Sequence, residues 1–144
     1  MHRIDSFQNY PKSEDVRREE PDPSKAKGLI QMATKDMERV KEEKINSQSS
    51  SYVFKNAYDV IRKSITALMA LQGYSAFSHK AVIAYARDRL LLPKSKISKL
   101  DRFRRLRNNI QYRAENANTR EAKEIVEFMQ EIVPEMEKEL KKLD

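Results

Sequence analysis

The sequence predicts an all-α protein, an up-and-down antiparallel bundle of four to five helices. Its 144 residues include only two glycines, Gly28 and Gly73. That is too few for the hairpin turns of an all-β fold or for a Gly-rich phosphate loop. The chain is 39% hydrophobic and 35% charged, a balance that suits amphipathic helices with wide solvated faces. Its length is right for one domain with one core.

The chain divides at its prolines near position 22. Residues 1–21 show no hydrophobic period, so we expect a tail that is disordered or draped on the domain. We expect residues 22–144 to form a single helical domain. Its first helix is predicted over 24–46, because Asp22 offers a capping side chain and apolar residues then recur every three or four positions.

The middle of the chain predicts two further helices. The second runs from Tyr52 to Gln72 and stops at Gly73, a natural residue just after a helix end. A short loop, residues 74–77, follows it. The third helix is predicted over 79–92, because Pro93 cannot continue it.

The last two helices are predicted over 95–116 and 119–143, with Asn118 among the capping residues between them. Pro134 lies inside the final helix, where apolar periodicity continues past it, so we expect a kink and not a break. The connections are short, which favours antiparallel neighbours.

Composition excludes several classes of site. The absence of cysteine excludes disulfides and thiolate chemistry. With only His2 and His79, and no pair of carboxylates on an apolar face, no metal and no cofactor is predicted. No run approaches the roughly 20 apolar residues of a membrane span, and the N-terminus lacks a signal-peptide pattern. We therefore expect a cytoplasmic protein without membrane contact.

The positive charge is concentrated in one segment. The chain has a net charge of +7, and between Lys94 and Asn116 eight basic residues stand against two acidic ones, a net +6. Such a cluster suits a phosphate-bearing partner, and it equally suits a solvated helix face.

Arg107 interrupts the apolar stripe of the 95–116 helix. It lies on the same face as Phe103 and Ile110, where an ordinary amphipathic helix carries leucine. A buried guanidinium needs a carboxylate, an opening to solvent or an anionic ligand. Two interpretations remain open. In the structural one, either Arg107 reaches solvent from the edge of the stripe or Leu106 takes the core position in its place. In the functional one, Arg107 faces a groove or subunit interface and binds phosphate.

Polar side chains surround this arginine within about one helical turn. They form a cationic patch that we predict to bind nucleotide or RNA. The predicted binding residues are Arg104, Arg107, Asn108, Gln111 and Tyr112.

The run 102–112, together with the segment 73–83 and the preceding Ala57-Tyr58, resembles HEPN domains (higher eukaryotes and prokaryotes nucleotide-binding). The resemblance spans about residues 50–133. It implies a helical bundle that forms a homodimer, often encoded beside a minimal nucleotidyltransferase as a toxin–antitoxin pair. It also implies RNA cleavage in the active members.

One position departs from those active members. They carry a histidine four to six residues after the arginine, where this chain has Tyr112, as in a histidine-lacking branch of the family. Imidazole exchanges protons near neutral pH and a phenol does not, so the resemblance favours binding over cleavage. His79 matches a Ser-His segment of related proteins, where we expect it to cap or pack the third helix.

Three hypotheses follow. The first is a non-catalytic or weakly active HEPN protein that binds RNA or a nucleotide and pairs with a minimal nucleotidyltransferase. The second is a metal-independent endoribonuclease that uses Arg107 and Tyr112 as catalytic candidates. The third is a protein-interaction bundle without a nucleic-acid role, whose basic helix docks on an acidic protein surface.

Overall fold

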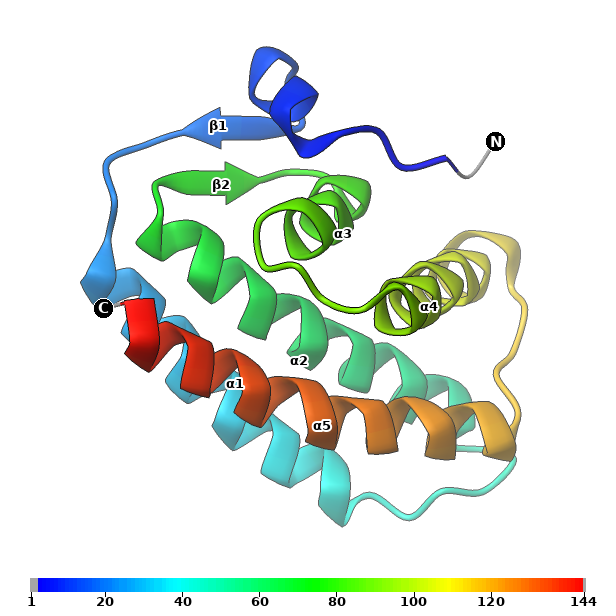
Figure 1. Cartoon of the computed structure of the whole chain (residues 1–144). Coiled ribbons are helices and arrows are strands. Elements are labelled where there is room, and N and C mark those ends of the chain that lie inside the picture. The colour runs from blue at the N-terminus through cyan, green and yellow to red at the C-terminus, as the bar shows by residue number, and fades with distance from the viewer. Residues whose placement is uncertain (1–2, 144) are drawn as a thin grey trace.

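The structure, a computed structural model, describes residues 3–143, so His2 lies outside the described residues. The described part is an all-α helical bundle with a two-stranded sheet at one end, which confirms the predicted fold class (Figure 1). Its elements, in chain order, are the 3-10 helix η1 (Phe7–Lys12), strand β1 (Val16–Arg18), helices α1 (Pro23–Glu42) and α2 (Ser50–Leu71), strand β2 (Tyr74–Ala76), and helices α3 (His79–Asp88), α4 (Lys94–Arg113) and α5 (Thr119–Leu143).

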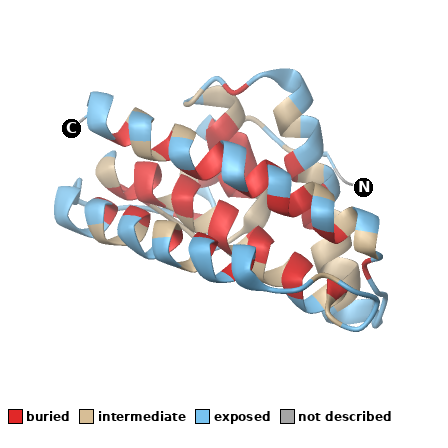
Figure 2. Ribbon diagram, turned by 90° about the horizontal axis from the view of Figure 1, so that it is seen from below, coloured by how far each residue is buried: buried red, intermediate tan, exposed pale blue. Residues whose placement is uncertain are grey.

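Helix α2 lies at the centre of the bundle. It packs against α1 and α5 on one side and against α3 and α4 on the other (Figure 1). Its buried residues face both layers, and buried positions line the inner faces of its neighbours (Figure 2). Helix α1 is antiparallel to α2 as predicted. In contrast, α5 runs in the same direction as α2, and the layer of α3 and α4 lies across α2 (Figure 1).

Local capping signals set the bounds of α5. The Asn118 Oδ1 accepts the Glu121 N–H at 2.8 Å, and the Glu121 Oε1 accepts the Asn118 N–H at 3.0 Å. This reciprocal capping box fixes the start of the helix. The helix continues through Pro134 to Leu143, which confirms the predicted range 119–143.

The third helix ends earlier than its apolar residues predict. It stops at Asp88 and not at residue 92, because Leu91 adopts a left-handed φ of 57°. The Tyr85 carbonyl accepts N–H groups from both Arg89 and Leu90, which closes the helix end. Since a residue before proline is kept out of the helical region, Leu92 cannot prolong it.

Two other helices also end earlier than predicted. The first ends at Glu42 instead of 46, because Glu43 is extended. The fourth ends at Arg113 instead of 116, because Ala114 is left-handed with φ 54°.

The prediction of a loop over 74–77 is wrong, because Tyr74–Ala76 form strand β2. This strand pairs antiparallel with β1, with Val16 opposite Ala76. A strand of three residues has no period to detect, and its partner lies far away in the sequence.

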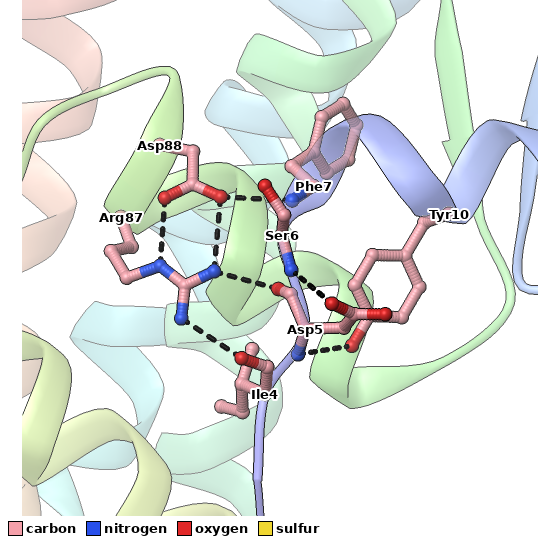
Figure 3. Close-up of polar contacts among 7 residues, drawn as sticks. All are labelled: Ile4, Asp5, Ser6, Phe7, Tyr10, Arg87 and Asp88. Carbon is pink, nitrogen blue, oxygen red and sulfur yellow. Dashed lines mark hydrogen bonds and ion pairs between the residues drawn. The ribbon is translucent and has the colours of Figure 1, made fainter.

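The N-terminal segment, residues 3–21, lies against the bundle and contributes to its core. Phe7 is fully buried, and its ring packs edge-on against Tyr74 and Tyr85, each with a centroid distance of 5.2 Å. Its N–H donates to Asp88 Oδ2 at 2.8 Å (Figure 3). Of the two expectations for this segment, the described residues correspond to the draped one.

Arg87 at the end of α3 also holds this segment. Its Nη1 donates to the Ile4 carbonyl at 3.1 Å and its Nη2 to the Asp5 carbonyl at 2.6 Å (Figure 3). The same guanidinium hydrogen-bonds Asp88 and thereby lowers the pKa of that carboxyl. The carboxylate therefore stays ionised and available to the Phe7 N–H.

Gly73 is predicted to be irreplaceable in the turn between α2 and β2. It has a φ of +86°, and an added Cβ would lie 2.6 Å from the Glu19 carbonyl oxygen. We expect Gly73→Ala to lower the free energy of unfolding by about 1–3 kcal/mol, as a strained backbone does. Gly28→Ala is the matched control, because nothing lies within 4 Å of its added Cβ and helix propensity improves by about 1 kcal/mol. Urea denaturation measures both; equal effects would contradict the account.

Candidate functional site

A polar hollow lies along the exposed side of α4. It is lined by Arg104, Arg105, Asn108, Asn109, Tyr112 and Arg113. The lining includes three of the five predicted binding residues. Tyr112 is 77% exposed, so its ring is open to a ligand. Gln111 is exposed on the same helix but does not line the hollow.

Arg105 and Arg113 were not among the predicted binding residues, yet they supply accessible charge to the hollow. Arg105 lies 3.5 Å from the Asp101 carboxylate and is 42% exposed. Arg113 is exposed at the helix end, with no ion pair inside the described chain. The basic cluster in the sequence contained both, but periodicity alone could not separate them from a merely solvated face.

Arg104 lies at the inner wall of the hollow and is only 4% exposed. Its Nε and Nη2 donate to Asp101 Oδ1 at 3.0 and 2.7 Å. A charge paired in this way is held in place by its own helix. It therefore adds to the local potential but has little freedom to move toward a ligand.

Arg107 points away from this hollow, toward α2. Its Nη2 lies 3.4 Å from Asp59 Oδ1, and its side chain is 16% exposed. This supplies the carboxylate that the sequence argument required. The contact is long for an ion pair, and Arg107 Nε is buried without a hydrogen-bond partner among the described residues. An unsatisfied buried donor costs about 1–3 kcal/mol, so the pairing with Asp59 is incomplete.

A second polar group lies where α2, α3 and α4 meet, and we call it the junction cluster: Tyr58, Asp59, Arg62, His79 and Arg107. His79 stacks on the Tyr58 ring at 5.5 Å with an interplanar angle of 8°. The N-terminal cap of α3 is Ser78, whose Oγ accepts the Ala81 N–H. His79 thus has a packing contact and leaves the capping to its neighbour.

The junction cluster is positively charged around a neutral imidazole. Burial, and then the nearby Arg62 and Arg107, lower the pKa of His79 to about 4. Burial also raises the pKa of the Tyr58 hydroxyl well above its ordinary value. Arg62 Nε and His79 Nδ1 are buried and, within the described residues, lack partners. Together with Arg107 Nε, three buried nitrogen atoms of the junction cluster are therefore left without a hydrogen-bond partner among the described residues.

Sequence reasoning missed Tyr58, Asp59 and Arg62. Tyr58 and Arg62 are four residues apart and share a face of α2, a spacing that puts side chains in contact. This pair was the feature of the sequence that could have indicated a site on α2. It was overlooked because the buried stripe of α2 is broad and Tyr58 belongs to it.

The geometry supports anion binding more than acid–base chemistry. Arg107 is directed at α2, whereas Tyr112 lies exposed in the α4 hollow, so within one chain the two catalytic candidates do not meet. His79 is neutral at pH 7. Among residues 3–143 no group of acidic residues and histidines is arranged to hold a metal ion. None of the described helices is long and apolar enough to cross a membrane.

Comparison with known proteins agrees with the helical architecture. No curated protein matches the chain. The model of the HEPN domain matches residues 26–140, which is well over half of the sequence and covers all of α2, α3 and α4. The chain belongs to the HEPN domain family.

Proposed function

We propose that this HEPN protein binds RNA or a nucleotide through phosphate contacts along α4 and does not cleave it, or does so only weakly. The observation that carries the proposal is the α4 hollow, whose lining consists of arginines, asparagines and one exposed tyrosine. Arginine's planar fork suits phosphate oxygens, and amides add hydrogen bonds.

Four of the six residues that line the hollow make direct contacts with the ligand in the proposed complex. Arg105 and Arg113 contact successive phosphates, since their charges are accessible. Tyr112 stacks on a base, a contact that tolerates any sequence. Asn108 hydrogen-bonds the sugar–phosphate backbone, and Gln111 extends this surface along the helix. Binding of this kind is sensitive to salt and unspecific in sequence.

The proposed assembly is a homodimer that pairs with a minimal nucleotidyltransferase, as in a toxin–antitoxin pair. Its support is the HEPN resemblance together with the partly buried Leu106 and Ile110 on α4, which a second copy can cover. Light scattering of the purified protein tests the dimer. Co-purification of the native protein tests the nucleotidyltransferase, and recovery of an acidic protein without RNA would favour the interaction-bundle alternative.

We expect no RNA cleavage by the purified protein in the presence of a chelator. The physical reason is that Tyr112 lies on a different side of α4 from Arg107. His79, the imidazole that shares the junction cluster with Arg107, has its pKa lowered to about 4, too low for proton transfer near neutral pH. Incubation with a mixed-sequence RNA and gel electrophoresis provide the measurement. Metal-free degradation that disappears in Arg107→Ala would establish the endoribonuclease alternative instead.

A further inference from the structure

We infer that the junction cluster is a second phosphate subsite, which takes the dianionic phosphomonoester of a nucleotide or of an RNA end and in which His79 gains a proton as the anion binds. This inference rests on the proposed binding function and deepens it. It concerns Arg62 and His79, which lie outside the α4 hollow.

The unpartnered atoms locate the subsite. Arg62 Nε on α2, His79 Nδ1 on α3 and Arg107 Nε on α4 are all buried, and none of them has a hydrogen-bond partner in the described structure. They come from three helices that pack against one another, and Arg62 and Arg107 are both near enough to act electrostatically on His79. A phosphate group carries several acceptor oxygens and can satisfy donors that arrive from different directions.

The charge count identifies the class of anion. Arg62, Arg104 and Arg107 act together on His79. Asp59 lies beside Arg107, and Asp101 is shared between Arg104 and Arg105, so these two carboxylates offset at most two of the three charges. At least one positive charge is therefore in excess, and protonated His79 adds another. A phosphomonoester carries about two negative charges at neutral pH, whereas an internal phosphodiester carries one. The cluster thus matches a terminal phosphate.

His79 becomes protonated on binding because the bound anion changes the electrostatic surroundings of its imidazole. The groups that face this imidazole are Tyr58, Asp59 and Arg62 from α2 and Arg104 and Arg107 from α4. In the free protein, burial and the arginines hold its pKa near 4. A dianion between these groups offsets the arginines and raises that pKa, so binding takes up a proton and strengthens as the pH falls toward about 6.5. Below about pH 6 the phosphate itself becomes protonated, which opposes the trend.

The test compares three probes by calorimetry and anisotropy at low salt: AMP, a 5′-phosphorylated oligoribonucleotide, and the same oligoribonucleotide with a 5′-hydroxyl. We expect the 5′-phosphate to raise RNA affinity about tenfold, and affinity for AMP to rise at least about threefold between pH 8 and about pH 6.5. Binding of AMP without either RNA would identify a free nucleotide as the source of the phosphate. Equal binding of the two RNAs, with no binding of AMP, would overturn the subsite and leave the proposed function intact. Absence of binding by all three would overturn both.

Variants assign the effect to the cluster. Arg62→Gln should remove the preference for the 5′-phosphate, and His79→Gln should remove the pH dependence. Arg113→Gln is the matched control, because it lowers the affinity for both RNAs equally and keeps the preference. Helical circular dichroism checks that each variant folds. As a second readout on the unaltered protein, the NMR-titrated pKa of His79 should rise at saturating AMP, and an unchanged value would overturn the inference.

Discussion

Phe7→Ala is expected to lower the free energy of unfolding by about 3–5 kcal/mol, the usual cost of truncating a buried phenylalanine. The Phe7 side chain is fully buried, with its ring edge-on to Tyr74 and Tyr85 and the Arg89 guanidinium 5.1 Å from its centroid. Its removal opens a cavity between η1, β2 and α3 that the rigid helices cannot close. Urea denaturation followed by circular dichroism measures the change.

The neighbouring position provides the control. Gln8 is exposed on the same short helix, so Gln8→Ala should change stability by no more than about 0.5 kcal/mol. If Phe7→Ala were equally mild, the N-terminal segment would be detached in solution and the packing of Phe7 against Tyr74 and Tyr85 would be refuted.

The double variant Arg105→Gln/Arg113→Gln should bind single-stranded RNA about 50-fold more weakly at about 50 mM salt. Each phosphate contact to a single strand contributes a slope of about −0.7 in a plot of log affinity against log salt, so losing two should lower the slope by about 1.4. Both arginines line the α4 hollow and neither is buried, so the fold should be unaffected. Fluorescence anisotropy across a salt series yields affinity and slope together.

A variant with the same change in net charge separates local contact from general attraction. Lys25 and Lys27 are exposed at the start of α1. The start of this helix lies at the opposite end of the bundle from α4 (Figure 1). Lys25→Gln/Lys27→Gln should keep the slope and weaken binding less than about twofold. Equal losses in the two double variants would mean that net charge, and not the hollow, attracts the RNA.

The helices were predictable where a local signal marks them. Gly73 ends α2 because its left-handed φ is nearly free of cost only for glycine. Asn118 begins α5 because its side chain reaches the N–H of a residue three positions later. Such signals depend on a few adjacent residues, and the sequence contains them in full.

The parts that depend on distant partners were not predictable. Strand β2 exists because β1 pairs with it, and Phe7 is buried because Tyr74 and Tyr85 receive it. Leu91 occupies a left-handed conformation that commonly belongs to glycine, so its sequence gives no warning of the helix end. Tertiary contacts overrode local preference at each of these positions.

The candidate site shows the same division. The periodicity of α4 identified Arg107 as an arginine that needs a partner, but it could not identify Asp59, which lies 48 positions earlier on α2. It also grouped Arg107 with Tyr112, although the structure directs the two side chains to different surroundings. His79 became a candidate site residue only from the structure, which stacks it on Tyr58 and places arginines near it.

The most direct test of the central claim, that α4 binds the phosphates of RNA, is an NMR titration of the isotope-labelled protein with a single-stranded RNA at low salt. We expect the side-chain amides of Asn108 and Asn109 and the backbone amides at the end of α4 to shift progressively, while those of α1 stay in place. Shifts confined to other helices, or none at millimolar RNA, would contradict it.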